Sequence, residues 1–532
     1  MQTVLERATG PVAGQEDYPL LGIVIGYGIL VLVVWHFHGL LWFPAINRLL
    51  SQSSTYEVTT APPSFAVRQG DRPSLGVDEL ARLRQLFENR QFERLEKEFS
   101  LLQEAFEEDP AREYAVNDAW GIFGYPPPDQ QQGFDAWIAH SPNHFAPYLA
   151  RACYFVGKGW EARGGNFASE TSVDQFRGMR EFFHFAGLDL DRAMWLKSRL
   201  LPAYLLRLDI ENAQGERGGE IKVFADARVL FPDSFLLYST LLHTRLPRWG
   251  GSYEEMESLS RQALQRVDKN PEMYLLFGKI YQDQARKMRR EGKFTKAVDL
   301  SSKALRFGGH SDFFEERARN YLCLRDLERA LADVKQAIGL RPVREAPHRL
   351  CATILLNRGD LDGALREIAV ARQLSPWKSA VKSWDSWAAG YLMRKGHAVF
   401  GEHLSEALLF YDRALELDPN HAETLYWRGI GHDRQGQPDK ALADVRQSLS
   451  SDPGRFEAYR LLDRLLTKKG QRGEVVAAWD RFISLQPDHA DAHLERAGTY
   501  RHMGNMPRAL ADLKRACDLG SQEACQIQQR HR

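Results

Sequence analysis

The sequence predicts an all-α fold in which paired helices stack into a solenoid, and three periodic features support this prediction. Two sets of residues recur every 34 positions: Pro419, Pro453 and Pro487, and Gly436, Gly470 and Gly504. Alanines also recur seven positions apart, which places them on one helix face: Ala297 and Ala304, Ala330 and Ala337, Ala364 and Ala371, Ala407 and Ala414, Ala509 and Ala516. A period of this length is typical of stacked helix–turn–helix units, because each unit buries its apolar face only against its neighbours.

The unit from Ala422 to Arg455 shows what each position contributes. Gly429 is small where two helices must approach closely, and Gly436 follows the first helix, where glycine adopts a left-handed backbone most easily. Ala441 lies in the second helix, and Pro453 ends that helix because proline cannot continue it. Each unit is therefore predicted to be two short helices joined by tight turns.

These glycine, alanine and proline positions resemble the tetratricopeptide repeat (TPR) family. About seven units fit between residues 278 and 523. The resemblance implies a right-handed α-solenoid whose concave face binds a protein or peptide, without catalysis. One unit departs from the period: Pro376 and Pro419 are 43 residues apart, so an extended first helix or loop is expected near Lys395–His403.

The resemblance also implies which residues line the concave face, because the first helix of each unit faces it in this family. Aligning the units by their prolines gives seven candidate groove residues: Arg349, Tyr426, Arg434, Arg460, Arg464, Lys468 and Arg501. Nearby acids partly offset their charge: Glu423, Asp433, Glu457 and Asp491. The groove is expected to be mildly basic and to take an acidic or carboxylate-ended peptide through charge-assisted hydrogen bonds from arginine. The alternative is an ordinary helix surface of mixed charge.

A membrane anchor is predicted at residues 20–43, after an N-terminal tail at 1–19. The segment contains no Asp, Glu, Lys or Arg. As a helix it would span roughly 36 Å, enough to cross a bilayer core of about 30 Å. A cleaved signal peptide is disfavoured, because the basic leading region and a small-residue cleavage site are missing. Gly22 and Gly26 form a G-x-x-x-G pattern that would make a homodimer face, although glycine is common in membrane helices in any case.

Two observations point to opposite sides of a bacterial inner membrane. Arg48, Arg68 and Arg72 follow the anchor whereas only Arg7 precedes it, which favours a cytoplasmic solenoid. In contrast, the final segment around Arg515–Gly520 with Cys517 and Cys525 resembles cysteine-bearing Sel1-like repeats. That resemblance implies a disulfide between helices and a periplasmic solenoid.

Residues 44–76 are predicted to be a Ser/Thr/Pro-containing linker, followed by a helical, TPR-like domain at 77–265 and the TPR solenoid at 266–532. The helical domain contains two distinctive segments, Gly159–Gly164 and Leu246–Ser252. They resemble a bacterial family of unknown function, which implies no activity. In the second segment, Ser252 and Glu255 form an S-x-x-E pattern that predicts a capping box at a helix start, and the alternative is a binding role for Arg248 and Trp249.

Enzymatic function is the weakest of the hypotheses. Its best site would be Trp160, Glu161 and Arg163, but the chain has none of the common metal, phosphate-loop or nucleophile motifs. Lys and Arg together number 70, as do Asp and Glu, so no overall charge favours nucleic acid. No cofactor or metal is expected. A basic run at Arg286–Lys296 is read as a solvated helix end or as a contact with an anionic membrane or partner.

The sequence as a whole predicts a single-pass, membrane-anchored scaffold or adaptor that binds a protein or peptide. The alternative is a structural component of a cell-envelope export or polysaccharide assembly.

Overall fold

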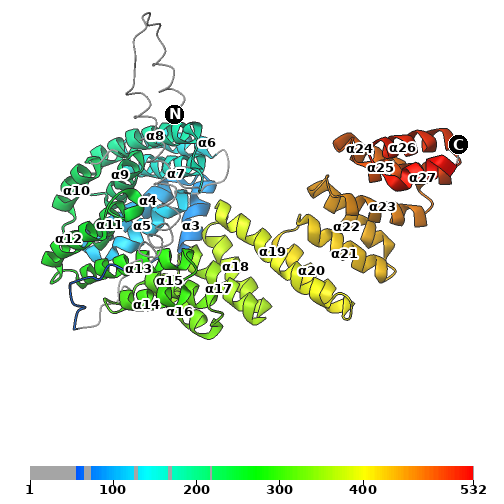
Figure 1. The fold of residues 1–532 in the computed structure, drawn as a ribbon. Helices are drawn as coiled ribbons and strands as arrows, with labels where there is room; N and C mark the ends of the chain where they lie inside the picture. Colours follow the sequence, from blue (N-terminus) through cyan, green and yellow to red (C-terminus); the bar gives the residue numbers. More distant parts are fainter. Residues whose placement is uncertain (1–54, 65–72, 125–129, 166–169, 216–217, 531–532) are drawn as a thin grey trace, which may run out of the picture. The chain divides into compact units, whose positions relative to one another are not determined.

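The computed structural model describes residues 55–64, 73–124, 130–165, 170–215 and 218–530, and every regular element in these ranges is a helix (Figure 1). The predicted all-α class is therefore confirmed. The chain divides into two units, Met1–Thr59 and Thr60–Arg532. All the helices in the described ranges belong to the second unit.

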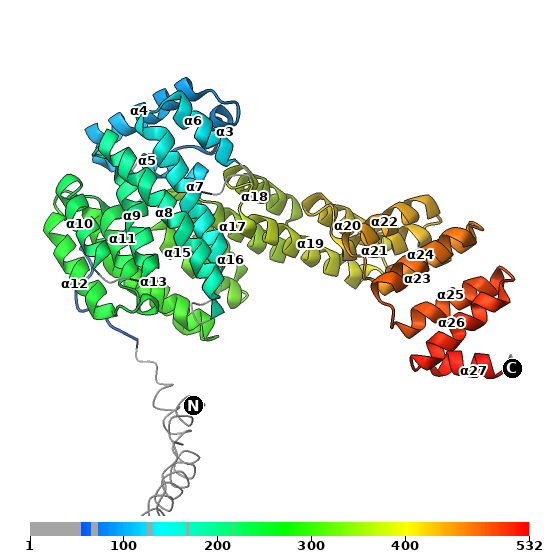
Figure 2. The same ribbon diagram turned by 90° about the horizontal axis from the view of Figure 1, so that it is seen from above.

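Seven helix pairs follow one another from Leu275 to Asp518, and the two helices of each pair contact each other (Figures 1 and 2). The pairs are α13 (Leu275–Arg290) with α14 (Phe294–Leu305), α15 (Ser311–Cys323) with α16 (Leu327–Leu340), α17 (Glu345–Arg358) with α18 (Leu361–Leu374), α19 (Ser379–Val399) with α20 (Leu404–Leu417), α21 (Ala422–Arg434) with α22 (Pro438–Ser451), α23 (Phe456–Lys468) with α24 (Arg472–Leu485), and α25 (Ala490–His502) with α26 (Met506–Asp518). A last helix, α27 (Gln522–Arg530), packs on α26. The fold is an all-α solenoid of TPR-like helix pairs.

The preceding region is also helical but less regular in helix length. Its helices are α3 (Val77–Glu88), α4 (Phe92–Glu108), α5 (Glu113–Trp120), α6 (Gln131–His140), α7 (Phe145–Arg163), α8 (Val173–Leu196), α9 (Leu201–Gln214), α10 (Gly219–Leu230), α11 (Phe235–Thr244) and α12 (Tyr253–Ala263), with short 3-10 turns that include η5 (Pro247–Trp249). Its first helix, α3, contacts α18 of the solenoid. The Arg84 guanidinium donates to the last carbonyls of α18, at 2.7 Å to Gln373 O and 2.9 Å to Leu374 O. The domain boundary at residue 266 stays a prediction.

The turns between the paired helices have the backbone that the glycine spacing predicts. Gly436, Gly470 and Gly504 have φ values of +72°, +75° and +77°, a conformation that costs glycine little and other residues more. The long unit is explained by α19, which continues to Val399 before its turn. The predicted extension near Lys395–His403 is therefore an extended first helix.

Close helix packing explains the small residues. At Gly278 in α13, an added Cβ would lie 2.4 Å from the Phe313 ring and 2.9 Å from the Ala304 carbonyl oxygen, so no larger residue fits. Ala441 in α22 is fully buried against the neighbouring helices. At Gly429 the added Cβ would meet Val445 Cγ2 at 3.1 Å. Both small positions in the unit at Ala422–Arg455 thus lie where two helices touch.

Arginines in first helices bridge successive pairs. Arg428 in α21 donates to Asp444 in its own pair at 2.7 Å and to Asp412 in the preceding pair at 2.9 Å. Two pairs later the arrangement repeats, with bonds from Arg496 to Asp512 at 2.7 Å and to Asp480 at 2.5 Å. Each acid is 16 residues from its arginine, so the two bridges have the same geometry. They fix the register of neighbouring pairs as well as the helices within one pair.

Three predictions concern segments at or near the chain ends. Residues 20–43, with Gly22 and Gly26, lie outside the described residues. In the part of the chain that the structure describes, no helix is long and apolar enough to cross a membrane.

Cys517 and Cys525 are joined by a disulfide that links α26 to α27, with a Cα–Cα distance of 4.8 Å. In the predicted linker, Thr60 donates to the buried Glu257 of α12 from its backbone N–H at 3.2 Å and its hydroxyl at 3.3 Å.

Candidate functional site

A groove of about 730 Å³ lies on first helices α21, α23 and α25, and we call it the C-terminal groove. Its lining residues are Tyr426, Ile430, Asp433, Arg434, Glu457, Arg460, Leu461, Asp463, Arg464, Lys468 and Glu495. Five of the seven residues predicted from the sequence are among them: Tyr426, Arg434, Arg460, Arg464 and Lys468. They meet because first helices of successive pairs present equivalent positions to the same surface.

The basic residues of the C-terminal groove are already in contact with acids or aromatic rings. Asp433 accepts from Arg464 at 3.1 Å and from Lys468 at 2.9 Å, and Arg460 pairs with Glu495 at 3.0 Å. These three cations remain more than half exposed, at 54%, 57% and 63%. Pairs whose cations are this exposed contribute little stability, so an anionic partner can compete for these donors, although the Asp433 carboxylate itself is only 12% exposed.

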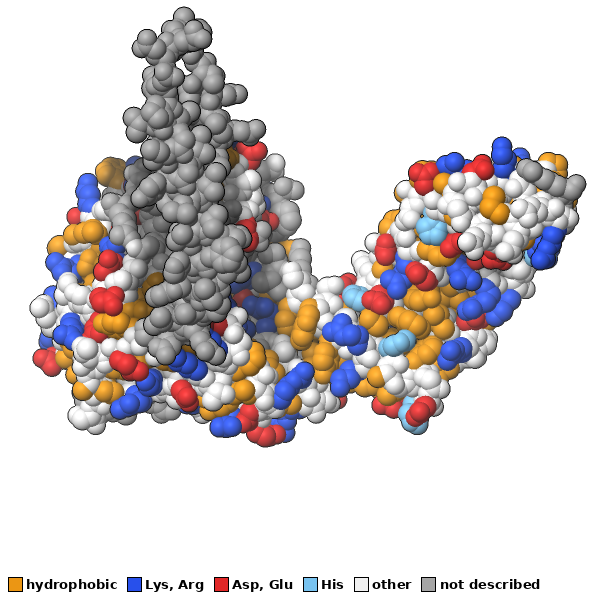
Figure 3. Space-filling model, in the orientation of Figure 1, with side chains coloured by type: hydrophobic (Ala, Val, Ile, Leu, Met, Phe, Trp, Pro, Cys, Tyr) orange, Lys and Arg blue, Asp and Glu red, His pale blue; other side chains and the backbone are white. Residues whose placement is uncertain are grey.

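The lining of the C-terminal groove carries no net charge, since four cations face four carboxylates. One of these acids, Asp463, is held from behind by the Trp479 indole, which donates to it at 2.7 Å. Burial raises the pKa of Glu495, although the Arg460 charge opposes this shift. In the space-filling view, basic, acidic and apolar side chains are interspersed over the C-terminal helix pairs (Figure 3).

The other two predicted groove residues lie elsewhere. Arg349 is in α17, four residues after Glu345, with which it pairs at 3.4 Å. Arg501 is exposed in the last turn of α25. The alignment by prolines therefore assigns these residues to first helices, but it does not place them in the C-terminal groove.

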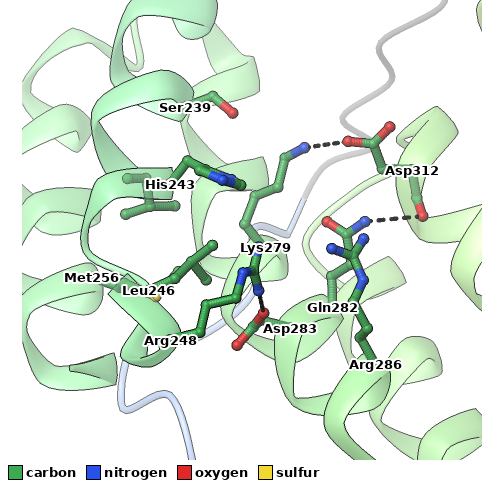
Figure 4. A pocket seen from close by; sticks show the side chains of 11 residues that line it. Ser239, His243, Leu246, Arg248, Met256, Lys279, Gln282, Asp283, Arg286 and Asp312 are labelled. Carbon is green, nitrogen blue, oxygen red and sulfur yellow. Dashed lines mark hydrogen bonds and ion pairs between the residues drawn. The ribbon is translucent and has the colours of Figure 1, made fainter. Parts of the chain in front are cut away.

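A second site was not expected from the sequence. A cavity of about 240 Å³ lies between α11, η5 and α12 on one side and α13 and α15 on the other, and we call it the α12–α13 cavity (Figure 4). Its lining residues are Ser239, Leu242, His243, Leu246, Arg248, Met256, Lys279, Gln282, Asp283, Arg286 and Asp312. Lys279 donates to Asp312 at 2.5 Å, and Arg248 pairs with Asp283. Its charged groups come from three separate stretches of the chain.

Burial shifts the titration of the groups around this cavity. Burial, together with the nearby charges of Arg248, Arg286 and Lys279, lowers the pKa of His243 to about 4. The His243 Nε2 atom lies 3.3 Å from the Trp249 indole nitrogen, which can only donate, so His243 accepts there as a neutral ring. Burial also lowers the pKa of Lys279, and the Asp312 carboxylate only partly opposes this shift.

The segment Leu246–Ser252 has the structural role weighed from the sequence, and the binding role of Arg248 and Trp249 stays a prediction. Ser252 Oγ accepts from the Glu255 amide at 3.2 Å and caps α12, as predicted. Gly251 is required by packing, because a Cβ there would lie 2.2 Å from the Arg245 carbonyl oxygen. Arg248, however, lines the cavity and faces Asp283 (Figure 4).

The three residues considered for catalysis have structural contacts. The Trp160 indole donates to the half-buried Asp209 at 2.9 Å, and Lys158 pairs with Glu161 at 2.7 Å. Arg163 lies over the Trp160 ring and donates to the carbonyl of Gly164 at 3.2 Å. Among the described residues there is also no group of three or more His, Cys, Asp or Glu that could hold a metal ion.

The sequence offered two partial signals for the α12–α13 cavity: the possible binding role of Arg248, and the basic run that includes Arg286, Arg289 and Arg290. In the structure, Arg286 and Arg289 approach the buried Glu316 of α15 at 3.5 and 3.0 Å. A solvated helix end therefore describes the run only in part. The contribution of α15, and the fact that Arg248 faces the same cavity, are invisible in the sequence, because they depend on how the helices pack.

Comparison with known proteins agrees with this architecture. Family models of the tetratricopeptide repeat match residues 410–443 and 464–524. The chain is 33% identical over 150 residues to an HSP-interacting protein of Zea mays, which is 28% of this chain and 19% of that protein. It is 20% identical over 219 residues to the mitochondrial import receptor subunit TOM70 of Homo sapiens, or 41% of this chain and 35% of that one.

Among solved structures, the C-terminal part of a TPR repeat-containing protein from Cytophaga hutchinsonii matches 46% of this chain and 98% of its own length. The identity is 15% and the TM-score is 0.31. The chain spans between about a fifth and about a third of the two curated relatives' lengths. The matched residues, together with the paired helices, identify the C-terminal part of this chain as tetratricopeptide repeats within an all-α solenoid of TPR-like helix pairs.

Proposed function

We propose that the protein is a scaffold or adaptor whose C-terminal groove binds an acidic or carboxylate-ended peptide of a protein partner. The convergence of Arg460, Arg464 and Lys468 in one groove of first helices supports this proposal most directly. Tetratricopeptide repeats typically mediate protein–protein interaction, and the curated relatives include an HSP-interacting protein and an import receptor subunit.

The contacts within the groove suggest how an acidic peptide would be held. Each of the three cations has exposed N–H groups, and each is paired with an acid of the groove itself. A peptide carboxylate would exchange with Asp433 or Glu495 for the same donors. Tyr426, Ile430 and Leu461 provide apolar contact between these charges. Since the lining is neutral overall, selectivity would come from the position of the donors rather than from a net field.

Charge reversal tests the proposal. Arg460→Glu with Arg464→Glu should abolish recovery of the partner in a pull-down from the native cell extract, with bound proteins identified by mass spectrometry. A matched control is Lys440→Glu with Arg481→Glu, because these exposed cations lie on second helices α22 and α24. The control should recover the partner as the wild type does. Equal recovery by the groove variant would refute peptide binding in this groove.

We further propose that residues 20–43 anchor the chain in a bacterial inner membrane, where Gly22 and Gly26 would pair two copies. The distribution of arginines around this segment supports a cytoplasmic solenoid. The Cys517–Cys525 disulfide supports the periplasmic alternative, because disulfides persist in oxidising compartments. A reporter fused to the C-terminus distinguishes the two, since alkaline phosphatase is active only outside the cytoplasm and green fluorescent protein exported in unfolded form is dark.

A second candidate function is a permanent structural part of a cell-envelope export or polysaccharide assembly. Crosslinking in intact cells followed by mass spectrometry separates the candidates. An adaptor should give crosslinks from the C-terminal groove that disappear in the Arg460→Glu, Arg464→Glu variant. A permanent component should give crosslinks over several faces that survive this change.

A further inference from the structure

The α12–α13 cavity continues into a second polar hollow of about 350 Å³ along α13, α15 and the start of α17. The two share Gln282, Arg286 and Asp312, so we treat them as one extended cavity. Seven cations line it: Arg248, Lys279, Arg286, Arg289, Arg290, Arg319 and Arg344. Four carboxylates face them: Asp283, Asp312, Glu315 and Glu316. The lining therefore has an excess of three positive charges.

The carboxylates of the extended cavity are shared between cations. Asp312 accepts from both Lys279 and Arg344. Glu316 lies 3.5 Å from Arg286 and 3.0 Å from Arg289. Glu315 is similarly shared, at 2.7 Å from Arg319 and 3.2 Å from Arg344.

Arg290 has no ion-pair partner among the residues that the structure describes, although it lines the cavity. A guanidinium group has five N–H donors in a planar fork, so pairing with one shared carboxylate leaves several of them unused. The extended cavity thus combines unused donors with unbalanced charge.

Burial makes part of this charge costly, although Arg290 itself is exposed. Glu316 is 3% exposed and the Lys279 side chain 16%, and charges repel one another more strongly away from water. Burial lowers the pKa of Lys279 and of Arg248, and the neighbouring Arg286 contributes to both shifts. An anion with more than one negative charge would neutralise the cavity and use its free donors.

We propose that the extended cavity binds the phosphate group of a small phosphorylated molecule. Phosphate carries close to two negative charges at neutral pH, whereas a carboxylate carries one, and arginine forks match its oxygens two at a time. Arg286 is the central donor, because it lines both hollows, and Arg290 and Arg248 lie on either side of it along the lining. The 240 Å³ hollow holds the volume of about eight waters, enough for a phosphate group and a few further atoms.

Calorimetric titration of the full chain tests this site with inorganic phosphate as the probe and acetate at equal ionic strength as its comparison. Phosphate should give saturable binding in the millimolar range or tighter, and acetate should not. Arg286→Gln should weaken phosphate binding at least about tenfold, because it removes charged donors from the centre of the cavity. Lys287→Gln is the matched control: it removes the same charge from α13 at an exposed position outside the lining, and should change affinity less than about twofold.

A thermal melt distinguishes a binding site from a purely structural charge cluster. If the excess charge belongs to an anion-binding site, Arg290→Gln should leave the melting temperature of the phosphate-free chain equal or higher. It should also reduce the rise in melting temperature that phosphate produces. Arg290 is exposed and free of ion pairs in the described region, so this variant tests the site even if Arg286→Gln fails to fold.

Three results would overturn the proposal: no saturable phosphate binding to the wild type, equal weakening by Lys287→Gln and Arg286→Gln, or a melting temperature lowered by Arg290→Gln with the phosphate effect unchanged. A phosphoserine peptide that binds where inorganic phosphate does not would also overturn it, since the ligand would then be a protein. All of these outcomes are independent of the partner pull-down on the C-terminal groove.

Discussion

First helices of helix pairs line the whole C-terminal groove and one side of the extended cavity, yet the balance of charge differs between the two sites. In the groove, four cations face four carboxylates, and the two cations that share Asp433 are more than half exposed although Asp433 itself is not. In the extended cavity, seven cations face four carboxylates, and the two cations that share the buried Glu316 are about a third exposed or less.

Ion pairs between similar residues on similar helices therefore contribute differently to stability in the two sites. Exposed and balanced pairs contribute little to folding and can be exchanged for a partner's charges. Buried pairs cannot be exchanged so easily, because removing one partner leaves a buried charge uncompensated. The lining still has more cations than carboxylates, because acids such as Asp312 and Glu316 each pair with two cations. Changes at Glu316, Ala441, His243 and Asp433 test this contrast, in order of decreasing expected effect.

The largest effect is expected at Glu316, the acid shared by Arg286 and Arg289. Glu316→Gln removes the charge that these two partly buried cations share and raises the excess charge of the cavity further. We expect the free energy of unfolding to fall by about 3 kcal/mol or more, measured by urea denaturation. Added phosphate should restore part of that loss. A loss under about 1 kcal/mol would show that the cavity behaves like an exposed surface.

A comparable effect is expected from packing in the frame of the C-terminal groove. Ala441→Leu overfills the space between helices of that unit, because Ala441 is fully buried, and should cost about 1–3 kcal/mol. Ala477→Leu, at an exposed position of α24, is the control and should change stability by less than about 0.5 kcal/mol. An unchanged melting temperature for Ala441→Leu would mean that apolar packing does not support this groove.

The extended cavity should also make stability depend on pH through His243. Its pKa is about 4 in the folded chain and near 6.5 when unfolded, so the unfolded chain takes up a proton first as pH falls. Stability from this group is therefore complete above about pH 6.5 and is lost as the pH falls toward 4. Because His243 is exposed, solvent screens the interaction, and the loss between pH 7 and pH 5 should be about 1 kcal/mol or less. Urea denaturation at the two pH values measures the loss. His243→Gln should remove only the share of His243, because the almost fully buried His310 has its pKa lowered well below the usual value and keeps its own share of the loss.

The smallest effect is expected at Asp433, the counterpart of Glu316 in the C-terminal groove. Asp433→Asn deprives Arg464 and Lys468 of a shared acceptor, but both cations are more than half exposed and remain hydrated. The free energy of unfolding should change by less than about 1 kcal/mol. The groove then gains one net positive charge, so recovery of an acidic partner should rise. If Asp433→Asn destabilises the chain as much as Glu316→Gln, the contrast between the two sites is wrong.

Much of the fold could be predicted from spacing alone. The 34-residue recurrence of Gly436, Gly470 and Gly504 predicts turns with left-handed backbone, and the structure confirms positive φ at all three. The long interval from Pro376 to Pro419 predicts the extension that α19 provides. These features are local, because they depend on the allowed backbone of one residue and on helix length.

The arrangement of side chains on the helices was less accessible. The candidate groove residues followed from alignment, and five of the seven line one groove, while Arg349 pairs with Glu345 and Arg501 lies exposed at the end of α25. The Arg428 and Arg496 bridges have a readable signal, an acid 16 residues to either side. That signal becomes meaningful only once the pairing of helices is known.

Residue spacing was sufficient to specify the helical period, the positions of the turns and the small residues between helices, because these depend on local backbone geometry and on one repeating contact. Helix packing, in contrast, is what brings Arg248, Arg286 and Asp312 into one cavity and buries Glu316 between two arginines. The physical reason is that charge balance depends on distances between helices far apart in the chain, and no residue spacing encodes those distances. What packs against a cation on a first helix therefore decides whether it can exchange its acid for a partner's acid or lacks a balancing negative charge.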